Sequence, residues 1–141
     1  TVLVLPNFCG NNTNSSQAWR QCTTLSAVDY AYVGGSQIYG INGNEFNGCS
    51  ALNTVVLRAA SVWKLGNISA FTGTPFASEG TGGTIYIPKA LYDHLGDGGS
   101  YDYKAATNWS TVNGYGTITW AKIEGSQYEN YYADGTPIPT T

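Results

Sequence analysis

The residue types best suited to catalysis are the adjacent Asp93 and His94, which precede a glycine-rich stretch. A histidine beside a carboxylate can act in general acid–base catalysis. The chain has only this one histidine, however, and no serine or cysteine lies in a nucleophile-elbow motif. A glycosidase needs two carboxylates across one bond, whereas the nine Asp and Glu residues are scattered. We therefore interpret the pair as a solvated surface feature and expect a non-enzymatic protein.

Residues 97–102, DGGSYD, look faintly like a calcium loop, but they lack the twelve-residue ligand pattern and its terminal glutamate. One histidine and no CxxC pair argue against zinc, so we expect no metal and no cofactor. The cysteines are Cys9, Cys22 and Cys49, and we interpret the last two as buried apolar residues. A disulfide between them, or with Cys9, stays open as an alternative, although the odd count weakens it.

The composition indicates a polar but weakly charged surface. Of 141 residues, 11% are charged and 18 are glycine, which is typical of extracellular and virion surfaces. A net charge of −3 argues against nucleic acid as a partner. No apolar run reaches the roughly 20 residues of a membrane span. The chain begins without methionine or a signal peptide, so we expect a processed protein or a fragment. Four N-x-S/T sequons, which we interpret as chance, begin at Asn11, Asn14, Asn67 and Asn108.

Two segments of the chain match each other at a constant offset. Residues 19–30 and 46–57 share an aromatic residue, a cysteine, a leucine and a valine at equivalent positions, 27 residues apart. Leucine-rich repeats have a period of about 20–29 residues. We therefore predict an α+β repeat fold, a short leucine-rich-repeat β-solenoid of about three to four coils. Its strands are predicted at residues 1–6, 25–32, 52–58 and 84–88. The residues predicted to face the shared core are Leu25, Val28, Tyr30, Leu52, Val55, Leu57 and Ile85.

The pattern changes after Pro88, and this suggests three regions. Residues 1–88 are predicted to form the coils. Residues 89–124 are predicted to form a C-terminal cap, because an uncapped coil would expose its core. Within the cap we predict helices at residues 89–95 and 101–110 and a strand at 117–123. The remaining residues, 125–141, contain Asp134-Gly135, Pro137 and Pro139 and are predicted to be an extended tail.

The repeated unit, aromatic-x-x-Cys-x-x-Leu-x-x-Val-x-Leu, resembles the BspA-like leucine-rich repeat family. The resemblance extends over residues 18–126. It rests most on segments similar to the terminal repeat and cap of that family: AFTGTPFA at 70–77, GGTIYIP at 82–88, YKAATNWS at 103–110 and IEGS at 123–126. For bacterial members it implies surface adhesion, and for members from tailed phages a virion structural or host-contact role. It implies no catalytic residues.

A leucine-rich array binds through the outward residues of its strands. These candidates are Leu3, Asp29, Val56 and Tyr86 in one row and Ala31 and Arg58 in the next. The face could hold a protein or a sugar, or it could equally pack against a neighbouring subunit. Our hypothesis is a structural and interaction module of a phage virion or surface appendage, located outside the cell. It would assemble as a homo-oligomer or with virion neighbours and contact the host.

The open edge at residues 1–5 favours this hypothesis, because an uncovered edge strand is a template for pairing. The alternative is a module of a bacterial cell-surface adhesin that binds host protein or glycan. The partners under that alternative are a host receptor or a surface sugar.

Overall fold

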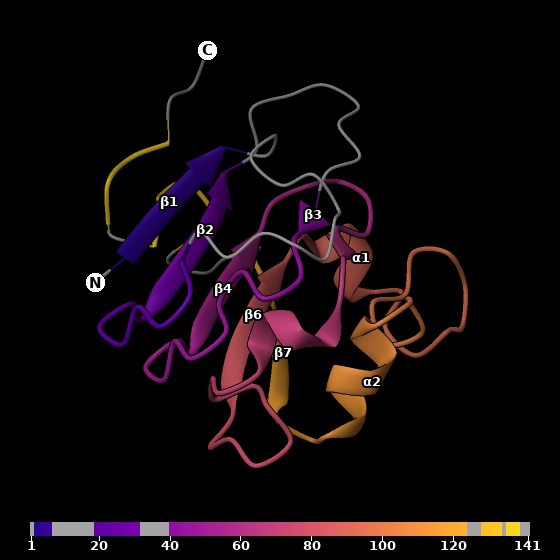
Figure 1. Cartoon of the computed structure of the whole chain (residues 1–141). Helices are drawn as coiled ribbons and strands as arrows, with labels where there is room; N and C mark the ends of the chain where they lie inside the picture. The colour runs from indigo at the N-terminus through magenta and orange to yellow at the C-terminus, as the bar shows by residue number, and fades with distance from the viewer. Residues whose placement is uncertain (1, 7–18, 32–39, 124–127, 134, 139–141) are drawn as a thin grey trace.

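The structure is a computed structural model that describes residues 2–6, 19–31, 40–123, 128–133 and 135–138. Its main feature is a sheet of five parallel strands in the order β1-β2-β4-β6-β7 (Figure 1). These strands are β1 Val2–Pro6, β2 Ala27–Ala31, β4 Thr54–Leu57, β6 Gly83–Ile87 and β7 Ile118–Lys122. A second sheet pairs β3 Gly40–Ile41 with β5 Lys64–Leu65 in parallel. The helical elements are the 3₁₀ turn η1 Ile68–Phe71 and the helices α1 Lys89–Tyr92 and α2 Trp109–Gly114.

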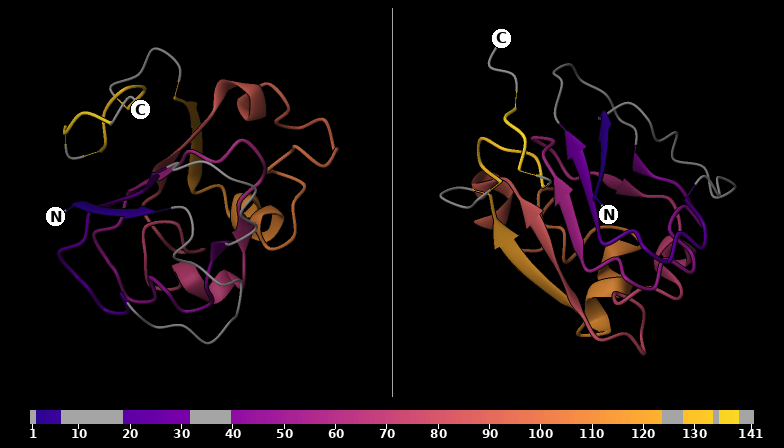
Figure 2. Two further views of the ribbon diagram at one scale, coloured as in Figure 1. Left: turned by 90° about the horizontal axis from the view of Figure 1, so that it is seen from above. Right: turned by 90° about the vertical axis from the view of Figure 1, so that its left-hand side faces the viewer.

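The hydrophobic core lies on one side of the five-stranded sheet. The register aligns Val28, Val55 and Ile85 on neighbouring strands, and all three are fully buried. The prediction of the core-facing positions is confirmed, because one buried cluster holds Leu25, Val28, Tyr30, Leu52, Val55, Leu57 and Ile85. Figure 2 shows η1 and α2 on this side of the sheet and residues 128–133, drawn in yellow, on the other. The sheet therefore separates a core face from an outward face.

The predicted α+β leucine-rich-repeat solenoid is wrong. The molecule is a small α/β fold with one five-stranded parallel sheet and two short helices, and no repeated coiling is evident in the described residues. The offset between residues aligned across the sheet grows along the chain, from 25 between Val2 and Ala27 to 35 between Ile85 and Trp120. The 27-residue match holds only between β2 and β4, where Val28 aligns with Val55. One matched pair of strands therefore suggested a regular period that the connections do not keep.

Most predicted elements exist with shorter bounds, but the helix predicted at residues 101–110 is wrong in its first part. Residues 101–108 form turns, and α2 begins only at Trp109. The buried carboxylate of Asp102 accepts hydrogen bonds from the backbone N–H groups of Gly98 and Lys104, at 3.0 and 2.8 Å. An aspartate that binds nearby backbone amides favours turns over a helix interior. Asn108, with φ of 67°, then breaks the chain direction before the helix starts.

The region predicted to be an extended tail, residues 125–141, contains one antiparallel bridge among the residues that the structure describes. Tyr131 and Pro137 form an antiparallel bridge, and Tyr132 N–H donates to the carbonyl of Thr136 at 2.8 Å. Gly135 has a positive φ of 89°, which glycine adopts without the steric cost of a Cβ. We call residues 128–133 the C-terminal segment. In the described residues, no helix has the length and hydropathy needed to cross a membrane.

Candidate functional site: the outward face of the sheet

The outward row of the sheet is defined by strand register. Val4 on β1 aligns with Asp29 on β2, Asp29 with Val56 on β4, and Val56 with Tyr86 on β6. The predicted row therefore holds Asp29, Val56 and Tyr86 together. It does not hold Leu3, because Leu3 aligns with buried Val28 and packs against the core. Ala31 is the last residue of β2, and its side chain lies outside the described part of the structure.

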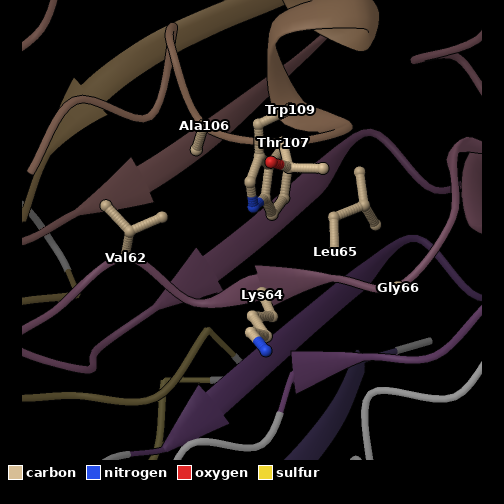
Figure 3. A pocket seen from close by; sticks show the side chains of 7 residues that line it. All are labelled: Val62, Lys64, Leu65, Gly66, Ala106, Thr107 and Trp109. Carbon is tan, nitrogen blue, oxygen red and sulfur yellow. The ribbon is translucent and has the colours of Figure 1, made fainter. Parts of the chain in front are cut away.

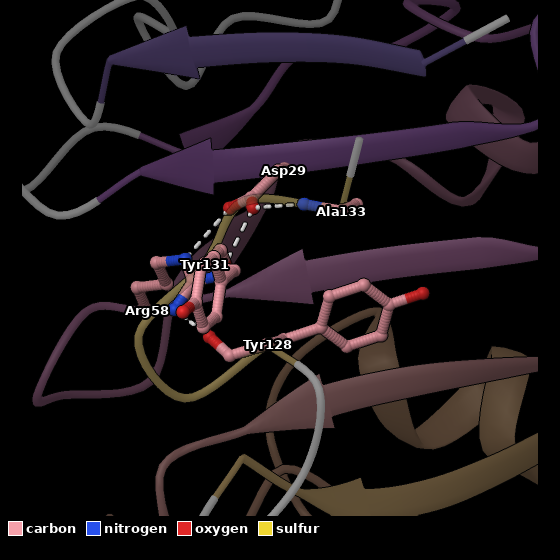
Figure 4. A network of polar contacts seen from close by, with 5 residues as sticks. All are labelled: Asp29, Arg58, Tyr128, Tyr131 and Ala133. Carbon is pink, nitrogen blue, oxygen red and sulfur yellow. Dashed lines mark hydrogen bonds and ion pairs between the residues drawn. The ribbon is translucent and has the colours of Figure 1, made fainter. Parts of the chain in front are cut away.

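Asp29 and Arg58 form a buried ion pair on this face. The Arg58 Nε donates to Asp29 Oδ1 at 2.8 Å, and Arg58 Nη2 donates to Oδ2 at 3.1 Å (Figure 4). The side chain of Asp29 is fully buried and that of Arg58 is 7% exposed. Two parallel hydrogen bonds fix the guanidinium in the plane of the carboxylate. Arg58 is one of only six Lys and Arg residues in the chain, and its charged side chain is buried rather than exposed to solvent.

The remaining hydrogen bonds of this pair go to the backbone of the C-terminal segment. Arg58 Nη1 donates to the carbonyl of Tyr128 and Nη2 to the carbonyl of Tyr131, both at 2.6 Å. Ala133 N–H donates to Asp29 Oδ2 at 3.0 Å. All three contacts involve main-chain atoms, so the side chains of Asp29 and Arg58 together recognise a polypeptide backbone with two carbonyls and one N–H.

Beside the ion pair, an apolar patch holds the start of the same segment. The Tyr128 ring meets the Tyr86 ring edge to face, with centroids 4.5 Å apart and planes at 74°. Tyr128 and Val56 are buried in a small cluster that also includes Ile123 and Ala133. Burial raises the pKa of the Tyr86 hydroxyl, and the neighbouring Tyr128 contributes a smaller increase. The outward face thus combines a slot for an aromatic ring with donors and an acceptor for backbone groups.

Sequence reasoning named Asp29, Val56, Arg58 and Tyr86 as candidates for a binding face, and whether they bind a ligand stays a prediction. It did not name the residues that contact them in the structure. Tyr128, Tyr131 and Ala133 belong to the segment that was predicted to be extended. The available signal was the cluster of tyrosines late in the chain. Composition alone does not tell which surface such a cluster covers.

The Asp93 and His94 pair is on the surface, as predicted. Asp93 accepts from Lys89 Nζ at 2.8 Å, whereas His94 Nδ1 lies 2.6 Å from Asp97 Oδ2. The side chains of all four residues are about half exposed. The hydrogen bond from Lys89 lowers the pKa of Asp93. The pKa of Asp97 is lowered mainly by the hydrogen bond from the Gly99 N–H and, to a smaller extent, by the hydrogen bond with His94. Asp93 and His94 therefore bind different residues, Lys89 and Asp97, rather than each other.

In residues 97–102, the stretch that resembles a calcium loop, the carboxylates of Asp97 and Asp102 accept hydrogen bonds from backbone N–H groups. Asp97 Oδ1 accepts from Gly99 N–H at 2.8 Å, and Asp102 accepts from Gly98 and Lys104. Burial raises the pKa of Asp102, but the backbone N–H bonds outweigh it and the net shift is downward. Within the described residues, no group of three or more His, Cys, Asp and Glu side chains is placed to hold a metal ion.

Cys22 and Cys49 are free thiols, so the alternative of a disulfide between these two is not realised. Cys49 is fully buried, and its Sγ donates to the carbonyl of Trp19 at 2.9 Å. Burial is the largest effect on Cys49 and raises its pKa. Cys9 lies outside the described residues.

A pocket of about 380 Å³ opens on the opposite side of the sheet, beside α2 (Figure 3). It is lined by Val62, Lys64, Leu65, Gly66, Ala106, Thr107 and Trp109. Trp109 Nε1 already donates to the Trp63 carbonyl at 2.6 Å, and Asn108 Nδ2 to the Leu65 carbonyl at 2.7 Å. Trp109 is fully buried, so it offers no open ring face for stacking. The outward face is the better candidate site, because its polar atoms already bind a polypeptide.

Comparison of the chain with protein-family models, with curated proteins and with solved structures gives no match. The resemblance to the BspA-like family therefore stays a prediction, and the function must be inferred from the geometry.

Proposed function

We propose that this chain is a non-enzymatic structural and interaction module that assembles with neighbouring subunits through the β1 edge of its sheet. We place it outside the cell, in a phage virion or surface appendage. The weakly charged composition and the sequence resemblance support this location. The burial of Cys49 and the use of Asp97 and Asp102 in backbone hydrogen bonds support a non-enzymatic role.

The observation that supports assembly is the difference between the two edges of the sheet. β1 pairs with β2 on one side and, among the described strands, with nothing on the other. Its residues Val2, Leu3 and Val4 are apolar and only partly buried. β7, at the other edge, carries Lys122 beside the ring of Tyr92 on α1, with Nζ 6.0 Å from the ring centroid. Charged residues on an edge strand discourage pairing, and β1 has none.

A lysine on β1 tests this proposal. We expect the wild-type chain to form oligomers at high concentration in size-exclusion chromatography with light scattering, and Val2→Lys to be monomeric. Thr119→Lys is the matched control, because Thr119 is an exposed residue of the opposite edge strand. A wild-type chain that stays monomeric at every concentration would overturn the proposal, as would equal effects of the two lysines.

A second candidate function is glycan binding by a bacterial surface adhesin. It is favoured by Tyr101, which is 51% exposed and whose ring lies 5.4 Å from that of His94. An exposed ring beside hydrogen-bonding groups suits the apolar face and the hydroxyls of a sugar. A glycan array tests it: binding should be lost in Tyr101→Ala and kept in Tyr115→Ala, the latter residue also being exposed. Absence of any glycan signal with the wild-type chain argues against this function.

A further inference from the structure

The polar contacts that Asp29 and Arg58 make to the C-terminal segment go to its main-chain atoms. Arg58 binds the carbonyls of Tyr128 and Tyr131, and Asp29 binds the N–H of Ala133. Such contacts depend on the path of the bound backbone and are the same whichever chain supplies it. With the segment in place, the carboxylate and the guanidinium are both buried, and the segment's backbone completes the hydrogen bonds that they do not make to each other.

The aromatic slot adds sequence selectivity to this backbone recognition. The Tyr128 ring is 7% exposed and packs against Tyr86 and Val56. A bound peptide therefore needs an aromatic residue at the first position, a free carbonyl three residues later, and an N–H five residues later. The segment of residues 128–133 has this chemistry, and every copy of the chain contains it.

We propose that the outward face of β2, β4 and β6 is a peptide-binding site whose intermolecular ligand is residues 128–133 of a second copy of this chain. Exchange between copies reproduces each contact seen within one copy, as in domain swapping. The covalently attached segment competes at an effective concentration in the millimolar range, so exchange requires crowded copies or a weakened resident segment. The inference rests on the face alone and is independent of the β1 edge.

The experiment mixes two variants of the 141-residue chain. The acceptor is Tyr128→Ala, whose own segment lacks the ring while its outward face is intact. The donor is Asp29→Leu with Arg58→Met, which removes both charges and the acceptor of the Ala133 N–H and leaves the segment intact. The donor is ¹⁵N-labelled, and the measured quantity is the rate of amide hydrogen exchange at Ala133 of the donor. We expect the acceptor, in millimolar excess, to slow this exchange by about tenfold or more.

Unlabelled donor added in the same excess is the matched control, because its outward face cannot bind the segment. Slowing by the acceptor alone supports exchange between copies. Equal rates in the two mixtures, or equal slowing by both proteins, overturns it. Circular dichroism establishes that each variant is folded. If this double replacement does not fold, Asp29→Ala with Arg58→Ala replaces it as donor, because it also removes both charges and the acceptor of the Ala133 N–H.

Discussion

Asp29 and Arg58 lie 29 residues apart in the chain, yet they meet through two hydrogen bonds on the outward face of the sheet. Asp29 sits in the middle of β2, and Arg58 follows directly after β4. Because β2 and β4 are adjacent and parallel, the carboxylate and the guanidinium reach the same place from neighbouring strands. The pair joins two strands to the C-terminal segment, and this makes it the most informative place to alter the protein.

Removal of the guanidinium should strongly destabilise the fold. Arg58→Ala leaves the Asp29 carboxylate buried with no ionic partner, and we expect a loss of about 3–5 kcal/mol in the free energy of unfolding. The double variant Asp29→Ala with Arg58→Ala should lose less, because no unpaired charge remains. Urea denaturation measures both. If the double variant is at least as unstable as Arg58→Ala, the ion pair is not the cause.

Glu45 should make stability depend on pH. It is 3% exposed, accepts from Asn42 N–H at 2.8 Å, and has a pKa raised chiefly by burial above the ordinary value of 4.5. The folded state therefore holds this proton more tightly than the unfolded chain does. Its contribution to stability is complete below pH 4.5 and declines as pH rises through the folded-state pKa.

Glu45→Gln should remove that decline, since glutamine does not ionise. Thermal unfolding of wild type and variant across this pH range measures the difference. The matched control is Glu79→Gln, the same replacement at an exposed position. A wild-type profile that rises relative to Glu45→Gln above pH 4.5 would contradict the assignment.

Gly83 should not tolerate a side chain. A Cβ at this position in β6 would lie 2.5 Å from the Asn53 carbonyl oxygen and 2.7 Å from the Phe76 ring. Because the carbonyl belongs to the backbone, it cannot move aside easily, and we expect Gly83→Ala to cost about 1–3 kcal/mol. A Cβ added at Gly114 in α2 would meet no atom within 4 Å, so Gly114→Ala should be neutral or slightly stabilising. Chemical denaturation of the two variants compares them directly.

The two described thiols should differ in reactivity. Cys49 is buried, its Sγ is hydrogen-bonded to Trp19, and its pKa is raised, so little thiolate is accessible. Cys22 is partly exposed. We expect iodoacetamide to modify Cys22 in the native protein and Cys49 only after addition of denaturant, as measured by peptide mass spectrometry. Modification of both at the same rate under native conditions would contradict the burial of Cys49.

The sequence alone indicated where the strands of the five-stranded sheet lie and which residues of β2, β4 and β6 face the core. Val28 and Val55 lie in the main core, and the next residue along β4, Val56, lies in the cluster on the other face, because a strand alternates its side chains between two faces. The same local matching was misleading about architecture. Similar strands at one offset say nothing about the lengths of the connections, which increase along this chain.

Only the tertiary structure decided how the outward face is used. The contact of Arg58 with Tyr128 spans 70 residues, and that of Asp29 with Ala133 spans 104. These hydrogen bonds go to backbone atoms of the C-terminal segment. Because every residue has a backbone carbonyl, and all but proline an N–H, the side chains of that segment do not predict these bonds. Likewise, Val4 rather than Leu3 neighbours Asp29 because a shift of one residue in register exchanges the two faces of a strand. Local sequence patterns indicate which faces are apolar, whereas register and long-range contacts determine what lies on them.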